Sequence, residues 1–292
     1  MDAAIEIQLI AALTAAGCAL PGCFLLLRRM SMSSDSITHT ILLGIVLAFF
    51  AVQDLSSPLL LIGAAVMGPV TVWLTELLIK TRLLSEDSAT GIVFPLLFSI
   101  AVILITRYAG SAHLDTDSVL LGEIVFAPFD RLVVFGVDIG AKGLYLSGGL
   151  LFLNIVLIML FYKELQVSSF DPVLAAVLGF SPALLNYGLM TAASLTAVGA
   201  FEAVGSVLVT AFMIAPPAAA YLLTENLKKM LVLAVIIAAA SGILGYHTAV
   251  LMNVSIAGCM AVWTGVFFFG AFVFSVIKKR NGAKKQRDVT EL

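Results

Sequence analysis

The feature that most constrains this chain is a series of apolar stretches, each long enough to cross a lipid bilayer as a helix. A spanning α-helix needs roughly 20 apolar residues. The sequence therefore predicts an all-α, polytopic membrane helix bundle with about nine spans. Two successive pairs of stretches are separated only by Phe201–Glu202 and by Leu251–Met252. If one of these short connections does not separate two helices, the number of spans is eight. The stretches lie near residues 7–27, 37–54, 58–80, 90–107, 144–162, 183–201, 203–223, 230–250 and 253–277.

Composition supports this prediction, because the chain is 61% hydrophobic and only 12% charged. A soluble domain is about half apolar and about one-quarter charged. With so few charges the chain cannot cover a core with a solvated surface, so lipid must form its surroundings. The net charge of −2 gives no reason to expect a nucleic-acid partner. The three cysteines lie in apolar runs without paired spacing, which favours small core side chains over disulfides.

Lysine and arginine predict the orientation of the helices. The first apolar stretch is followed, not preceded, by basic residues, which argues against a cleavable signal. If the N-terminus is outside and the C-terminus is cytoplasmic, Arg107, Arg131 and Lys142 lie outside, and the rest of the 16 basic residues lie inside. That asymmetry follows the positive-inside rule. We expect one transmembrane domain over residues 1–280 and a basic cytoplasmic tail over residues 281–292.

The longest predicted outer segment spans residues 108–143. It contains an apolar piece, Val119 to Phe129, which is too short to span and is interpreted as interfacial or re-entrant. The segment also carries several carboxylates. They could gather cations, or they could form an ordinary solvated polar face.

The predicted cytoplasmic segment over residues 163–182 contains a short helix with clear boundaries. Asp171 can cap its N-terminus, Pro172 suits the first helical position, and Gly179 suits the C-terminal cap. Between them lies an apolar run of about two turns. Phe170 precedes the cap. This helix either folds back on the bundle or docks on a cytoplasmic subunit, since apolar surface in water needs a partner.

Ionisable side chains within spanning helices are costly and point to function. Asp35 and His39 are four residues apart, on one face of a predicted helix. A carboxylate with an imidazole suits a divalent transition metal, although such an ion needs more ligands than one pair supplies. Asp35 could instead be an N-cap, and His39 a satisfied buried histidine. Glu202, between two apolar stretches, is a candidate third ligand or gate, or a simple helix-turn charge.

One further charged residue and one pair of prolines lie within the predicted spans. Glu76 lies one turn before Lys80 and is interpreted as a boundary residue or its ion-pair partner. Pro216 and Pro217 interrupt the hydrogen-bond ladder of the stretch at 203–223, which makes that stretch a candidate for lining a path. The chain contains no GxxxxGK[ST] motif, so we expect any ATP hydrolysis to reside in another subunit and this chain not to be an enzyme.

Three of these segments together resemble the permeases of the manganese/zinc/iron branch of ABC importers. They are LLLRRMSMSSDSITHTILLGIVLAF, FYKELQVSSFDPVLAAVLGFSP and AVGSVLVTAFMIAPPAAAYLLT, in that order. The resemblance covers roughly residues 5–275 of the chain and is closer to the manganese type than to the zinc type.

The resemblance implies a multi-pass protein of the bacterial cytoplasmic membrane that imports manganese, zinc or iron and holds no permanent cofactor. It implies as partners a cytoplasmic ABC ATPase dimer, a second permease that is identical or paralogous, and an extracytoplasmic metal-binding protein. It also implies that Asp35 and His39 line the metal path. Two alternatives stay open: a siderophore- or vitamin-type ABC permease, and a secondary metal carrier that works without an ATPase.

Overall fold

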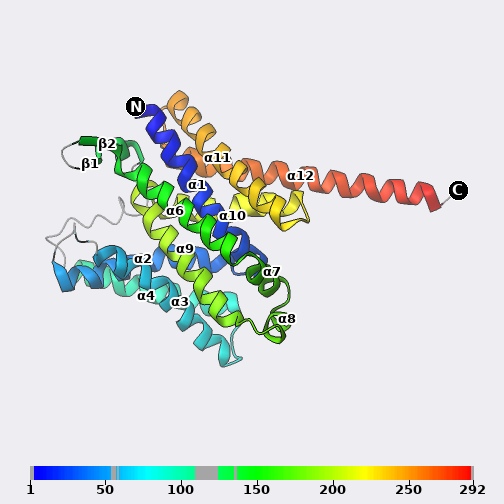
Figure 1. Cartoon of the computed structure of the whole chain (residues 1–292), viewed down its shortest axis with the longest axis horizontal. Helices are drawn as coiled ribbons and strands as arrows, with labels where there is room; N and C mark the ends of the chain where they lie inside the picture. Colours follow the sequence, from blue (N-terminus) through cyan, green and yellow to red (C-terminus); the bar gives the residue numbers. More distant parts are fainter. Residues whose placement is uncertain (1–2, 54–56, 58, 109–123, 135–136, 291–292) are drawn as a thin grey trace.

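The protein is an elongated bundle of helices (Figure 1). The computed structural model describes residues 3–53, 57, 59–108, 124–134 and 137–290. Within these ranges nine helices are long and apolar enough to cross a membrane, which confirms the predicted fold class. They are α1 (Ala3–Leu27), α2 (Ser31–Val52), α3 (Leu59–Lys80), α4 (Glu86–Tyr108), α6 (Lys142–Leu160), α9 (Pro182–Val204), α10 (Ser206–Leu223), α11 (Leu227–Met252) and α12 (Ile256–Thr290).

Three boundaries differ from the sequence-based expectation. Helix α2 begins at Ser31, six residues before the expected start near residue 37, because hydrophobicity does not register the buried serines of its first turns. The break between α9 and α10 falls at Gly205 rather than at Phe201–Glu202, and its positive φ of 77° is a conformation that favours glycine. Helix α12 continues through the basic residues to Thr290, far beyond the bundle (Figure 1).

Pro216 and Pro217 lack the N–H donors of the hydrogen-bond ladder, as expected, but they do not end their helix. Helix α10 is continuous from Ser206 to Leu223, and both prolines are buried inside it. In a membrane helix, neighbouring helices and local adjustments can accommodate the donor that a proline lacks.

The spans form two groups, and only the second of them is centred on α1. Helices α2, α3 and α4 pack on one another and share a separate apolar cluster that includes Leu42, Val46, Met67, Val93 and Leu97. Helix α1 lies against α6, α10 and α11, and α12 packs on α10 and α11. Helix α9 contacts α1, α2, α3 and α6, so it bridges the two groups.

Glycines allow the closest helix contacts. At the crossing of α2 and α3, a Cβ atom on Gly63 would lie 2.6 Å from the carbonyl oxygen of Gly44, and one on Gly44 would overlap Gly63 in turn. A Cβ atom on Gly22 of α1 would overlap the carbonyl oxygen of Met213 in α10. Membrane helices associate through such small residues because lipid offers no hydrophobic driving force.

The shorter elements lie at opposite ends of the bundle. The 3₁₀ helix η1 (Ile124–Phe129) and the antiparallel hairpin of β1 (Arg131–Val134) and β2 (Val137–Ala141) lie near the N-terminus (Figure 1). Helices α7 (Tyr162–Phe170) and α8 (Pro172–Val177) lie at the other end (Figure 1). We call these the hairpin end and the α8 end. Of the segment interpreted as interfacial or re-entrant, residues 119–123 lie outside the described residues.

Candidate functional site

Asp35 and His39 face each other on α2. The distance from His39 Nε2 to Asp35 Oδ1 is 3.5 Å, as the four-residue spacing on a helix allows. The interpretation of Asp35 as an N-cap is wrong, because the helix begins at Ser31 with Met30 in the cap position. The Asp35 carboxylate is therefore not engaged in capping.

The pair is open on one side. The side chain of Asp35 is 40% exposed and that of His39 is 24% exposed. The imidazole packs against two aromatic rings of α4, with centroids 5.4 Å from Phe94 and 5.9 Å from Phe98. The rings hold the imidazole from one side and leave the carboxylate accessible, so this histidine is not a fully buried core residue.

The beginning of α2 is inserted into the bundle. The hydroxyl of Ser34, next to Asp35, donates to Met213 Sδ at 3.1 Å, and Thr38 shares a 3.0 Å hydrogen bond with Thr210. The backbone of Met213 also meets Gly22, which lies five residues before the end of α1. At 1.5 Å per residue, this contact lies roughly 7 Å inside that end. Asp35 is thus beside the interior of the bundle rather than beyond its surface.

No third ligand joins the pair within the part of the chain that the structure describes, where no group of three or more His, Cys, Asp or Glu side chains could hold a metal. Glu202 lies in the last turn of α9, next to the break at Gly205, but its side chain is outside the described residues. Its role as a ligand or gate stays a prediction.

The short helix predicted after Asp171 is present as α8. Asp171 caps it, with its Oδ1 accepting from the backbone N–H of Leu174 at 2.9 Å, and Pro172 occupies the first turn. Gly179 follows with a φ of 87°, the left-handed conformation that favours glycine after a helix. A short helix of this kind depends on its caps, because it has too few internal hydrogen bonds to be stable alone.

Helix α8 does not bury its apolar face against the bundle. Within it only Ala175 is buried, whereas Val173 and Val177 are 73% and 78% exposed. Phe170 and Leu178 are exposed beside them. Apolar side chains that remain exposed on a capped helix need another surface to cover them.

A polar network beneath α8 was not anticipated from the sequence. The Arg28 guanidinium donates to Ser168 Oγ at 2.6 Å, to Ser169 Oγ at 3.0 Å and to Asn186 Oδ1 at 3.2 Å. Burial lowers the pKa of Arg28 from its ordinary value. The sequence indicates Arg28 only as one of the basic residues that set the orientation of the helices. Spacing along the chain does not show that α1, α7 and α9 converge here.

The network continues to α3 through Glu76. Asn186 Nδ2 donates to Glu76 Oε1 at 3.4 Å, and the Tyr187 hydroxyl donates to Glu76 Oε2 at 2.5 Å. The predicted ion pair with Lys80 is therefore replaced by hydrogen bonds to α9. Lys80 is exposed at the end of α3, where water solvates it.

Ion pairs dominate the hairpin end. Glu6 of α1 is only 3% exposed and accepts from Arg131 Nη1 of β1 at 3.3 Å. Arg131 also lies 3.7 Å from Asp138, and Lys142 lies 3.5 Å from Asp130. These carboxylates of the outer segment are thus paired with basic neighbours, which favours the structural interpretation of Asp130 and Asp138 over cation gathering.

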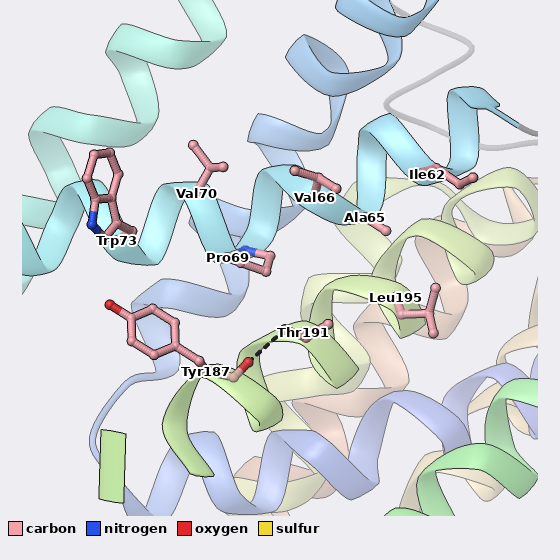
Figure 2. A pocket seen from close by; sticks show the side chains of 9 residues that line it. All are labelled: Ile62, Ala65, Val66, Pro69, Val70, Trp73, Tyr187, Thr191 and Leu195. Carbon is pink, nitrogen blue, oxygen red and sulfur yellow. Dashed lines mark hydrogen bonds between the residues drawn. The ribbon is translucent and has the colours of Figure 1, made fainter. Parts of the chain in front are cut away.

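A separate groove of about 540 Å³ lies between α3 and α9 (Figure 2). Figure 2 shows Pro69 on the side of α3 that lies toward α9, and Tyr187 and Leu195 on α9. Trp73 of α3 also lines the groove. Its lining is almost entirely apolar and includes neither Asp35 nor His39. It therefore offers no carboxylate, imidazole or thiolate ligand to a transition-metal ion.

Comparison with known proteins decides the family. The sequence model of the family described as "ABC 3 transport family" matches residues 2–275 of this chain. The chain belongs to this family. It is a membrane permease subunit of an ABC transporter, as the three sequence segments predicted, and ATP hydrolysis resides in a separate subunit.

Named relatives agree with this family. The chain is 46% identical over 263 residues to the manganese transport system membrane protein MntD of Bacillus subtilis, covering 90% of this chain and 89% of the relative. It is 51% identical over 271 residues to the zinc transport system membrane protein TroD of Treponema pallidum, covering 93% and 74%. A bacterial multi-pass membrane location follows.

Solved structures support the fold. The structure of PsaBC from Streptococcus pneumoniae in complex with Fab superposes with a TM-score of 0.77 at 28% identity, covering 93% of this chain and 91% of that one. An inward-facing ABC transporter described as of the metal-chelate type gives a TM-score of 0.62 at 20% identity, covering 94% and 85%. The second likeness shows the fold alone, so the fold does not separate metal ions from metal chelates.

Proposed function

We propose that this chain is the membrane-spanning subunit of an importer of divalent transition-metal ions, with manganese favoured over zinc and iron. The observation that carries the proposal is the Asp35–His39 pair, 3.5 Å apart on a spanning helix and open on one side. The relatives whose names specify a substrate include both manganese and zinc systems, which supports a metal cargo and leaves the choice of ion to experiment.

The exposure of Asp35 supports a second permease subunit. A charged side chain that faces lipid costs roughly 2.5–3.5 kcal/mol at the centre of a spanning helix. The cost is lower toward a helix end, and Asp35 lies in the second turn of α2, but exposure to lipid there still favours a partner or a water-filled path. One Asp–His pair also supplies too few ligands for a transition metal. If an identical or paralogous permease meets this face across a two-fold axis, it brings a second pair and makes a set of four donors. Glu202 is a further candidate ligand.

The remaining assembly follows from α8 and the charge distribution. In our proposal α8, with Phe170, Asp171, Pro172 and Gly179, docks on a cytoplasmic ABC ATPase dimer, and an extracytoplasmic metal-binding protein delivers the ion at the hairpin end. This places the N-terminus outside and the C-terminus in the cytoplasm, with residues 1–280 as one permease domain and residues 281–292 as a basic tail. Closure of the ATPases would alternate access to the path, and weak binding would favour release.

The test is competition uptake of Mn²⁺, Zn²⁺ and Fe²⁺ in cells whose only metal importer contains this chain. Asp35→Asn and His39→Gln should each lower Mn²⁺ uptake by about tenfold or more, since losing a ligand costs at least as much as losing a group that orients one. Asp87→Asn and His247→Gln are matched controls, because both side chains are exposed at helix ends.

Wild-type uptake by both Asp35→Asn and His39→Gln would contradict the metal path. Preferential uptake of a metal chelate would favour the siderophore-type alternative. Metal uptake by the purified chain in vesicles without ATP would favour the secondary carrier.

A further inference from the structure

Arg28 lies where α1 gives way to α2. Its backbone N–H still bonds to Phe24 of α1, and Arg29 then turns the chain with a φ of 62°. Helix α2 begins three residues after Arg28, and Asp35 follows in its second turn. A displacement of Arg28 therefore acts on the first turns of α2 through a very short connection.

The three side-chain hydrogen bonds of Arg28 join this connection to the coupling segment. Two of them reach Ser168 and Ser169, in the last turn of α7, and Ser168 is buried. Helix α7 leads directly into α8, with Asp171 shared between the end of one and the cap of the other. A planar guanidinium holds several acceptors in a fixed geometry, which the single ammonium of lysine cannot reproduce.

The third hydrogen bond extends the network to the helices that surround α2. Asn186 of α9 accepts from Arg28 and donates to Glu76 of α3, to which Tyr187 also donates. Helix α3 packs along α2 through the Gly44–Gly63 crossing. Arg28 thus has two routes to the Asp35–His39 pair, one along the chain and one through α3.

We propose that Arg28 is a positioning residue for transport, which passes movement of the coupling segment to the start of α2 and so to Asp35 and His39. This inference rests on the proposed function, since it takes α8 as the docking helix. The partners that Arg28 contacts directly are neutral, so the contacts can slide or exchange without separating an ion pair. Coupling between sites needs such a contiguous element with more than one arrangement.

A purely structural role makes a different prediction. If Arg28 only anchors α7, its loss lowers assembly, ATP hydrolysis and transport together. If it couples the two regions, ATP hydrolysis continues while less metal moves per ATP. The ratio of Mn²⁺ transported to ATP hydrolysed separates these roles.

The experiment uses the full transporter, purified through this chain and reconstituted into vesicles with Mn²⁺ and MgATP. Arg28→Gln should lower the ratio of Mn²⁺ transported to ATP hydrolysed by about tenfold, a factor within the usual range for coupling between two sites. Arg28→Lys should restore only part of it. Arg29→Gln is the matched control, since Arg29 is adjacent and exposed, and should keep the wild-type ratio.

A second variant tests the same contacts if Arg28→Gln fails to assemble. The double substitution Ser168→Ala and Ser169→Ala removes two acceptors and leaves the arginine in place, and it should also lower the ratio. An unchanged ratio in this variant, or in Arg28→Gln, overturns the role of Arg28. Absence of Mn²⁺, Zn²⁺ and Fe²⁺ uptake by the wild-type transporter would overturn the proposed function itself, so the two failures are distinguishable.

Discussion

Helix α1 carries one charged contact at each end, and the two contacts are built differently. At the hairpin end, Glu6 is buried against an opposite charge, Arg131. At the α8 end, Arg28 is half-buried among three neutral acceptors. The Glu6–Arg131 pair resists separation because Arg131, although 39% exposed, is the cation that compensates the buried Glu6 carboxylate. Neutral acceptors are exchanged at lower cost, so the difference suggests a fixed hairpin end and an adjustable α8 end.

The largest expected effect comes from Arg131→Gln, which leaves the Glu6 carboxylate buried without its cation. We expect a loss of about 3 kcal/mol in the free energy of unfolding, as for other broken buried pairs. Denaturant unfolding of the detergent-purified protein measures it. Arg107→Gln, at an exposed site, should leave the stability unchanged. Equal free energies of unfolding for Arg131→Gln and Arg107→Gln would show that the Glu6–Arg131 contact does not fix the hairpin end.

Arg28→Gln should destabilise the protein less than Arg131→Gln. Three hydrogen bonds to neutral acceptors are weakened, but no opposite charge is left unpaired, so we expect a loss of about 1.5 kcal/mol in the free energy of unfolding. The same unfolding measurement applies, with Arg29→Gln as the control. A loss as large as that of Arg131→Gln would show that the α8 end is as rigid as the hairpin end.

Asp171→Ala removes the N-cap of α8 and should lower the stability of that helix by about 1 kcal/mol, within the usual range for N-caps. Because α8 is exposed and packs mainly on α7 and α9, global unfolding should barely change. Hydrogen exchange of the α8 amides measures the local effect. Asp171→Asn keeps an acceptor and should retain protection, and equal exchange in both variants would contradict the capping role.

The smallest effect is expected at the exposed ion pair of the hairpin end. Lys142 and Asp130 are 48% and 60% exposed, so water and salt screen their attraction. Lys142→Gln should change the unfolding free energy by about 0.5 kcal/mol or less. A larger loss, approaching that of Arg131→Gln, would mean that burial of Glu6 is not what distinguishes the two pairs.

Sequence alone determined the transmembrane character and the capping of α8. Hydrophobicity over about 20 residues is a local property, and so are the Asp171–Pro172 start and the Gly179 end of a helix. The Asp35–His39 pairing could also be predicted, since four-residue spacing places two side chains on one helix face. Hydrophobicity located α2 only approximately, because its first turns contain buried serines.

Tertiary structure decided which polar groups meet. Arg28 lies more than 130 residues from Ser168 and Asn186 along the chain, and Glu6 lies similarly far from Arg131, so no local pattern indicates these contacts. The Glu76–Lys80 interpretation failed for the same reason: spacing offered a partner on the same helix, and α9 supplied better ones. Local patterns determine which segments form spanning helices and what caps α8, although they do not place the start or the cap of α2. Only the packing of distant helices determines which charges are buried together.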